Sequence, residues 1–384
     1  MYNDGFLQKK LGERKAVNAF RSLRLPQDKV DFCSNDYLGI VKNNLLQNYL
    51  VSSSQLAPAS SPGISVNSHL TTVNYSSGSA GSRLLAGNYP LIEEAEKLIA
   101  AFHQGDAALI FNSGYDANVG VLSCVPQKGD TVIYDALSHA SIRDGIRLSF
   151  ATSFSFKHND MQDLEKKLVK AIGTAFIVTE SVFSMDGDMC PLREILMLCK
   201  KYSAHLILDE AHATGVIGER GEGLAQHFGL HENIFCRMHT FGKACGCHGA
   251  VVLGSQALRD YLINFARSFI YSTALPEHAV AFIQASYNVF PFMKEERGHL
   301  QKLIAKFQVA EIAYEKLPSN TPIQIIMIPG NTAARNVADT LQESGLDVRA
   351  ILYPTVPRDK ERLRIVLHAF NTEEELDRLA EVLR

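Results

Sequence analysis

The sequence predicts an α/β protein built around a mostly parallel sheet, followed by a smaller α/β domain. Between residues 107 and 209, five short apolar segments alternate with stretches in which apolar side chains recur at helical spacing. Strands that alternate with helices in this way form βαβ units and a parallel sheet. Beyond residue 317, three strand-like segments and a helical pattern predict the smaller domain.

The N-terminal part has the least regular pattern. Residues 1–25 place apolar side chains at helical spacing among lysines and arginines, which predicts a basic amphipathic helix. Residues 31–39 predict a short strand and a polar turn, and residues 52–87 are rich in Ser, Pro, Asn and Gly. Such a loop leads into a helix expected from Leu91, and it can present backbone N–H groups to an anion.

The central segment carries the alternating strands and helices. Asp160 and Pro191 mark two helix starts, because aspartate caps free backbone N–H groups and proline suits the first helical turn. Strands are expected at residues 107–111, 131–135, 153–156, 174–180 and 206–208, with helices after residue 115 and over 138–148, 160–171 and 191–202.

The C-terminal part begins with a helical pattern from Ala257 that breaks at Pro276 and continues to residue 317. Gly345 suits the C-terminal cap of the next helix, and Thr372 with Glu375 forms a capping box that opens the last one. Strands are expected at 322–328, 347–352 and 362–368. We expect three parts: an N-terminal helix and arm at 1–50, a large domain at 51–288 and a small C-terminal domain at 289–384.

Composition limits the possible functions. The chain has 384 residues, 46% of them hydrophobic and 21% charged, with a net charge of −3 and dispersed basic residues, so we expect no nucleic-acid partner. No apolar run approaches the ~20 residues of a membrane span, and the N-terminus does not resemble a signal peptide. The seven scattered cysteines suggest reduced thiols in a cytoplasmic protein. Cys245, Cys247 and His248 lie close together, but no second ligand pair completes a zinc site, so we expect no metal.

The stretch from Ala204 to Gly249 carries the clearest chemistry. An apolar strand ends in Asp209, His212 follows, and Lys243 lies among small residues about thirty positions further on. Ligands bind at the carboxyl ends of strands in open α/β sheets. Pyridoxal phosphate needs a lysine that forms a Schiff base and an acid that keeps its ring nitrogen protonated. Alone, the acid would more often be a solvated strand end and the lysine a loop residue; together they indicate this cofactor.

Motifs along nearly the whole chain resemble those of the α-oxoamine synthases, pyridoxal-phosphate enzymes of the aspartate-aminotransferase fold (fold type I). Members condense an amino acid with an acyl thioester and are homodimers with shared active sites. The matching motifs are SNDYLG at 34–39, GSAGSRLLAG at 78–87, FNSGYDAN at 111–118, DALSHASI at 135–142, ESVFSMDGD at 180–188, DEAHATGVIGERGEG at 209–223, HTFGKACG at 239–246, YSTALP at 271–276, YPTVP at 353–357 and RLRI at 362–365.

The resemblance assigns the cofactor contacts by position. It implies that Lys243 forms the Schiff base and then acts as the base on the substrate, that Asp209 pairs with the ring nitrogen, and that His212 contacts the phenolic oxygen. It places His139 on the ring face as a fourth catalytic residue. The remaining cofactor contacts that it implies are Gly114, Tyr115 and Thr240 at the phosphate, Ser184 near the ring, and Thr273 at the partner subunit's phosphate.

The resemblance also implies the substrate contacts. Arg364 would pair with the amino-acid carboxylate, since a planar guanidinium can bind a carboxylate through two hydrogen bonds. Arg21, Asn35 and Thr355 match other substrate positions. From the strand pattern alone, Arg364 could equally be an exposed strand residue.

Within the family, the GSRLLAGN loop favours the branch that joins alanine to a pimeloyl thioester in biotin synthesis. Leu352 stands where that branch usually has an arginine, so the acyl group stays open, as does its carrier, either CoA or an acyl-carrier protein. Further departures are Ile92, His239 and a longer segment at 50–76. Glycine- or serine-using relatives are the alternative. An inactive partner subunit of this fold would lack Lys243, and an aminotransferase would not explain SMDGD or SNDYLG.

Overall fold

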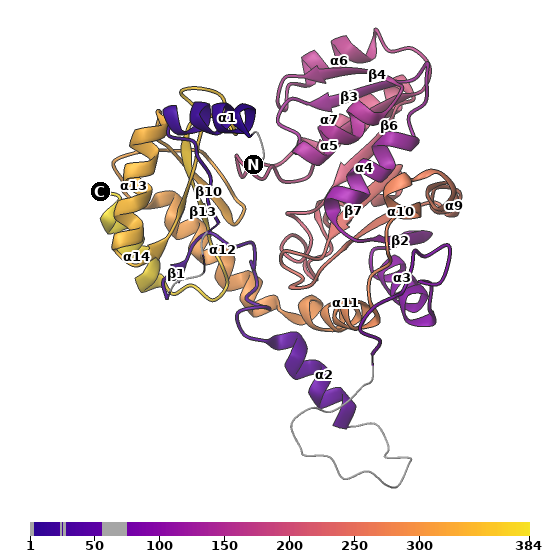
Figure 1. The fold of residues 1–384 in the computed structure, drawn as a ribbon, viewed down its shortest axis with the longest axis horizontal. Coiled ribbons are helices and arrows are strands. Elements are labelled where there is room, and N and C mark those ends of the chain that lie inside the picture. The colour runs from indigo at the N-terminus through magenta and orange to yellow at the C-terminus, as the bar shows by residue number, and fades with distance from the viewer. Residues whose placement is uncertain (1–3, 24, 26–27, 56–74) are drawn as a thin grey trace. The chain divides into compact units, whose positions relative to one another are not determined.

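The computed structural model describes residues 4–23, 25, 28–55 and 75–384, and these form two compact units (Figure 1). We call residues 38–183 and 189–294 the large unit, and residues 1–37, 184–188 and 295–384 the small unit. The domain boundaries that we predicted after residues 50 and 288 remain predictions. No described helix is long and apolar enough to cross a membrane.

The large unit contains a seven-stranded sheet with the order β2-β8-β7-β6-β5-β3-β4. Strands β3 to β7 pair in parallel, and β8 is antiparallel to both of its neighbours. The predicted fold class is therefore confirmed. The strands are β2 (Ala107–Phe111), β3 (Thr131–Asp135), β4 (Thr152–Phe156), β5 (Ala175–Glu180), β6 (His205–Asp209), β7 (Cys236–Thr240) and β8 (Ala250–Gly254).

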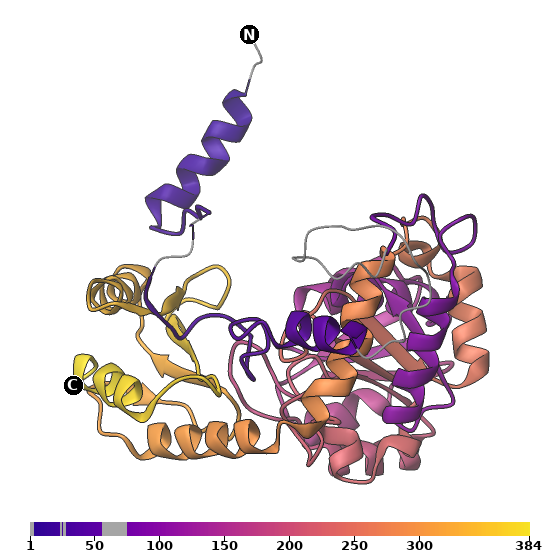
Figure 2. The same cartoon turned by 90° about the horizontal axis from the view of Figure 1, so that it is seen from below.

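Helices surround this sheet (Figures 1 and 2). Apolar side chains of α4, α5, α9 and α10 form a continuous buried core with those of the strands. Ser113, Asp160 and Ser255 each cap a helix by accepting a backbone N–H. The helices are α2 (Leu45–Gln55), α3 (Pro90–Phe102), α4 (Gly114–Cys124), α5 (Ala140–Leu148), α6 (Met161–Leu168), α7 (Leu192–Tyr202), α8 (Leu224–His227), α9 (Gln256–Phe265), α10 (Arg267–Ile270) and α11 (Glu277–Val289), with short 3₁₀ turns at His231–Asn233 and Phe290–Phe292.

The small unit contains a four-stranded antiparallel sheet with the order β12-β13-β10-β9 and a short parallel pair of β1 with β11. The strands are β1 (Val30–Asp31), β9 (Glu315–Lys316), β10 (Ile323–Met327), β11 (Leu346–Asp347), β12 (Arg349–Ile351) and β13 (Arg362–Val366). Its helices are α1 (Gly5–Ala16), α12 (Lys294–Val309, which begins at the last residue of the large unit), α13 (Asn331–Glu343) and α14 (Glu373–Val382).

Helix ends in the small unit follow local sequence signals. The capping box of Thr372 and Glu375 is present, and Gly345 follows α13 with a positive φ of 77°. The first helix is shorter than the predicted 1–25, since α1 ends at Ala16 and Asn18 has a positive φ of 52°. Figure 2 shows α1 in indigo projecting from the small unit, and none of its residues is buried.

Candidate active site

A cavity of about 230 Å³ lies in the large unit, where β5, β6 and β7 end and α4 begins. This is the edge of the sheet at which α/β proteins bind ligands. The cavity brings together seven residues predicted from the sequence: Gly114, Tyr115, His139, Asp209, His212, Thr240 and Lys243.

Lys243 lies in a tight connection between β7 and β8. Phe241 closes this connection by donating its N–H to Gly249 and accepting one from Cys247. The Nζ atom of Lys243 is 2.8 Å from Nε2 of His212, which comes from the turn after β6. The two side chains that the sequence placed about thirty positions apart therefore meet in the cavity.

Asp209 is the last residue of β6 and is 6% exposed. Its two oxygens accept hydrogen bonds from the backbone N–H of Ala211 and from Nδ2 of Asn118, both at 2.9 Å. These neutral donors fix the orientation of the carboxylate without neutralising its charge. Asp209 can therefore offer a negative charge to a protonated ring nitrogen.

His139 caps α5 and lines the same cavity. Its backbone N–H donates to Oε1 of Glu180 at 2.6 Å, and its Nδ1 is 2.7 Å from the hydroxyl of Ser141. Burial lowers the pKa of His139, against the opposing effect of Asp209. The ring is therefore favoured in its neutral form, which suits stacking on a flat heteroaromatic ligand.

The start of α4 provides a site for an anion. The first turn of this 11-residue helix leaves backbone N–H groups at Gly114 and Tyr115 without helical partners. The hydroxyl of Thr240 is buried there and has no hydrogen-bond partner among the described residues. A Cβ added to Gly114 would lie 2.5 Å from Cγ2 of Thr240, so the backbone approaches closely. A phosphate group at this position would accept hydrogen bonds from the backbone N–H groups and from the Thr240 hydroxyl.

The other predicted residues lie elsewhere. Thr273 lines a second cavity of the large unit, and its carbonyl accepts a hydrogen bond from Asn112. In the small unit, the guanidinium of Arg364 donates to the carbonyl of Ser184 at 2.7 Å and to Oδ1 of Asn35 at 2.9 Å. Arg364 is buried, so the alternative of an exposed strand residue is wrong.

Arg21 and Thr355 meet in the small unit, where the guanidinium donates to the hydroxyl at 2.6 Å. Both line a cavity of about 550 Å³ that also includes Leu352 and three more arginines, at positions 14, 335 and 349. Leu352, which departs from the family pattern, thus lies among arginine side chains.

The other departures also have defined surroundings. Ile92 is buried and lines the same cavity as Thr273. His239 is buried with its ring centroid 4.0 Å from that of His103, and its Nδ1 is 2.8 Å from the Thr214 hydroxyl. Most of the longer 50–76 segment, residues 56–74, lies outside the described residues.

Asn118, Ser141 and Glu180 line the cavity but were not predicted as site residues. Glu180 had one available signal, since it ends a predicted strand with an acid in the same way as Asp209. Asn118 and Ser141 fall inside matched motifs, yet nothing in their spacing distinguishes them from ordinary helix residues.

The cavity holds a lysine beside a histidine, a buried acid, a neutral imidazole and an anion site at the start of α4. These groups fit pyridoxal phosphate, and on this fold they define a fold type I pyridoxal-phosphate enzyme. Comparison with known proteins agrees with this class. The model of the aminotransferase class I and II family matches residues 27–383, and the chain belongs to this family.

Within the family, the chain is similar to curated 8-amino-7-oxononanoate synthases, which confirms the predicted resemblance to the α-oxoamine synthases. It is 41% identical to the one from Emericella nidulans, over 94% of this chain and 89% of that protein. It is 38% identical to the one from Marinobacter nauticus, over 98% and 94%.

Solved structures support the same fold. A crystal structure of 8-amino-7-oxononanoate synthase from Francisella tularensis has a TM-score of 0.74 and 28% identity, covering 92% of this chain and 96% of that one. Serine palmitoyltransferase from Sphingomonas wittichii has a TM-score of 0.87 and 25% identity, covering 100% and 97%.

Proposed function

We propose that this protein is a pyridoxal-phosphate-dependent acyltransferase that condenses alanine with a pimeloyl thioester, releasing carbon dioxide and the thiol, as in biotin synthesis. The observation that carries the proposal is the meeting of Lys243, Asp209, His212 and His139 in one cavity. Identities near 40% to 8-amino-7-oxononanoate synthases support the choice of substrates.

The large unit supplies the groups that would hold the cofactor. When bound, pyridoxal phosphate supplies an electron sink for bond changes at the amino-acid α-carbon. Lys243 would hold the cofactor and afterwards move a proton to or from the substrate, with His212 beside its amino group at 2.8 Å. Asp209 would keep the ring nitrogen protonated, and His139 would orient the ring.

The phosphate would bind at the start of α4. The backbone N–H groups of Gly114 and Tyr115 and the buried hydroxyl of Thr240 would donate to it. We also assign Ser184 to the surroundings of the cofactor, on the basis of its motif.

The small unit supplies the groups that would bind substrate. Arg364 is a buried guanidinium already oriented by Ser184 and Asn35, and it would pair with the carboxylate of alanine. Arg21 and Thr355 would contact the acyl donor, and their mutual hydrogen bond orders the arginine.

We further propose a cytoplasmic homodimer in which Thr273 contacts the cofactor phosphate of the other subunit. Thr273 is exposed, and the seven free cysteines suit a reducing compartment. Mixing inactive Lys243→Ala chains with impaired Thr273→Val chains should restore activity through hybrid dimers. Hybrids that form but stay inactive would argue that each site belongs to one chain.

The alternative is a relative that uses glycine or serine: a 2-amino-3-ketobutyrate CoA ligase, a 5-aminolevulinate synthase or a serine palmitoyltransferase. The serine palmitoyltransferase alternative is supported by the TM-score of 0.87 to the Sphingomonas wittichii enzyme, although the sequence identity to that structure is only 25%. Leu352 is a second reason to test the acyl group.

A substrate panel separates these functions. Alanine, glycine and serine would each be combined with pimeloyl-CoA, pimeloyl-carrier protein, acetyl-CoA, succinyl-CoA and palmitoyl-CoA, and thiol release would be measured. We expect alanine with a pimeloyl donor to react fastest, and Lys243→Ala to be the inactive control. Faster reaction of glycine or serine with another donor would refute the substrate assignment.

A further inference from the structure

Three carboxyl side chains end neighbouring strands beside the proposed cofactor cavity. Asp135 ends β3, Glu180 ends β5 and Asp209 ends β6, and the sheet places β5 between the other two. Glu180 is opposite Asp209 in the strand register. All three are buried, with exposures of 0, 3 and 6% respectively.

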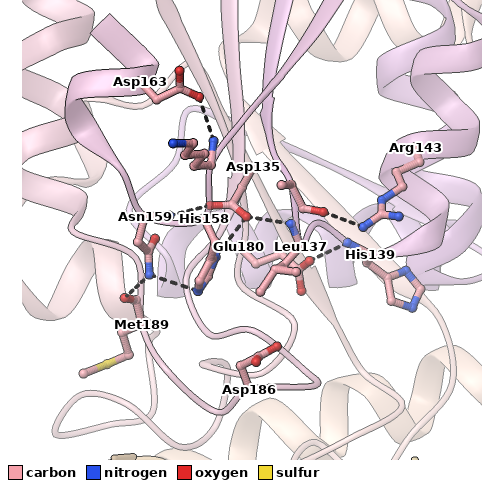
Figure 3. Close-up of polar contacts among 12 residues, drawn as sticks. Asp135, Leu137, His139, Arg143, His158, Asn159, Asp163, Glu180, Asp186 and Met189 are labelled. Atoms are coloured by element: carbon pink, nitrogen blue, oxygen red, sulfur yellow. Dashed lines mark hydrogen bonds and ion pairs between the residues drawn. The ribbon is translucent and has the colours of Figure 1, made fainter. Parts of the chain in front are cut away.

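The two outer carboxyls are surrounded by several donors. Asp135 accepts the N–H groups of Leu137 and Asn159 at 2.8 and 2.9 Å, and its Oδ1 is 3.0 Å from Nδ1 of His158 (Figure 3). Asp209 accepts two hydrogen bonds from neutral donors, as described above. Both oxygens of each of these two carboxyl groups therefore accept a hydrogen bond.

The middle carboxyl has a different environment. Glu180 accepts one backbone N–H, that of His139 at 2.6 Å (Figure 3). Burial and the flanking charges of Asp209 and Asp135 raise the pKa of Glu180 to about 8, against the opposing effects of the His139 N–H and of Lys243. Glu180 is therefore mainly neutral at pH 7.

The contact partner of Glu180 is the residue that would stack on the cofactor ring. His139 is held from two sides: its backbone by Glu180 and its ring by Ser141. Ser141 in turn accepts a hydrogen bond from Asn118, which also donates to Asp209. The position of the imidazole is thus connected to both carboxyl groups that line the cavity.

We propose that Glu180 is a positioning residue whose carboxyl group holds the backbone of His139, and through it the imidazole, in place beside the proposed cofactor ring. The role deepens the proposed function, since it assumes that the cavity binds pyridoxal phosphate. A protonated carboxyl accepts the His139 N–H without adding a second negative charge beside Asp209. Its ionisation adds that charge at the edge of the cavity.

Glu180→Gln tests this role, because glutamine has the shape of the neutral acid and keeps an oxygen for the His139 N–H. At pH 7 we expect kcat of Glu180→Gln to stay within about twofold of the original protein. Glu180→Ala leaves the buried N–H without an acceptor, and we expect a loss of about ten- to a hundredfold. A loss in Glu180→Gln as large as in Glu180→Ala would overturn the proposal.

Two readouts are independent of activity. In the full chain labelled with ¹³C at glutamate carboxyls, the signal missing from Glu180→Gln should titrate near pH 8 in the original protein. The absorbance of bound cofactor should show a transition in the same pH range that is absent from Glu180→Gln. Glu94→Gln, which removes an exposed carboxyl on α3, is the matched control and should keep the transition.

The outcomes separate this proposal from the proposed function. A carboxyl signal that titrates below about pH 6, closer to an ordinary glutamate, would overturn the role of Glu180 even if the condensation reaction is observed. So would a cofactor transition that persists in Glu180→Gln. If both titrations behave as expected but no thioester reacts with any amino acid, the role of Glu180 stands and the reaction assignment fails.

Discussion

The close approach of Gly114 to Thr240 gives a quantitative test of the phosphate site. In Gly114→Ala the new Cβ would lie 2.5 Å from Cγ2 of Thr240, whereas carbon atoms at optimal contact are ~3.5–4 Å apart. Overpacking of this kind costs about 1–3 kcal/mol. If the strain is relieved by displacing the first turn of α4 or the threonine, cofactor affinity should fall about five- to 150-fold.

The compensating change is Thr240→Ser, which removes the clashing methyl group and keeps the hydroxyl. We expect Thr240→Ser alone to bind cofactor nearly as well as the original protein, and the double variant to recover most of the affinity lost in Gly114→Ala. Thr240→Val is the matched control, since it keeps the methyl group and removes the hydroxyl, so it should not rescue. Equilibrium dialysis with pyridoxal phosphate gives the dissociation constant of each of these proteins. A double variant no better than Gly114→Ala would refute the geometry proposed for this site.

Three further outcomes are expected. Asp209→Asn should bind cofactor but lower kcat by at least about tenfold, since charge-assisted hydrogen bonds contribute about 1.5–3 kcal/mol; an unchanged kcat would show that the carboxylate is only a strand end. Glu96→Ala should lower the free energy of unfolding by about 3–5 kcal/mol, measured by urea titration with exposed Glu94→Ala as control, because Glu96 pairs with Arg83 at 2.6 Å and with a second arginine at 2.9 Å in a buried site. Leu352→Arg should raise the preference for a pimeloyl donor with a free carboxylate over its methyl ester by about ten- to a hundredfold, measured as the ratio of kcat/KM values; an unchanged ratio would place the acyl terminus elsewhere.

Local sequence patterns were sufficient to predict most strands of the large sheet. Strands β2, β3, β5 and β6 are apolar runs bounded by polar turns, so their positions follow from composition within one or two residues. Strand β7 was not predicted, because its sequence CRMHT mixes charged and apolar residues. It is nevertheless buried along its whole length, since Arg237 donates to the carbonyl of His103 and His239 packs on the His103 ring. Partners of this kind are distant in sequence and cannot be inferred from spacing.

The same limit explains which site residues could be predicted. The sequence was sufficient to predict Lys243, Asp209 and His212, because each has a chemical role that its residue type suggests. In addition, strand ends indicate the ligand-binding edge of the sheet. Glu180 ends its strand in the same way, yet its properties depend on two neighbouring carboxyls that are 45 and 29 positions away in the chain. The order of the strands, and not the local sequence, places an acid between two others. The raised pKa of Glu180 is therefore a consequence of the strand order. For this reason, substitutions at Asp135 should change the titration of Glu180 although Asp135 does not line the proposed cofactor cavity.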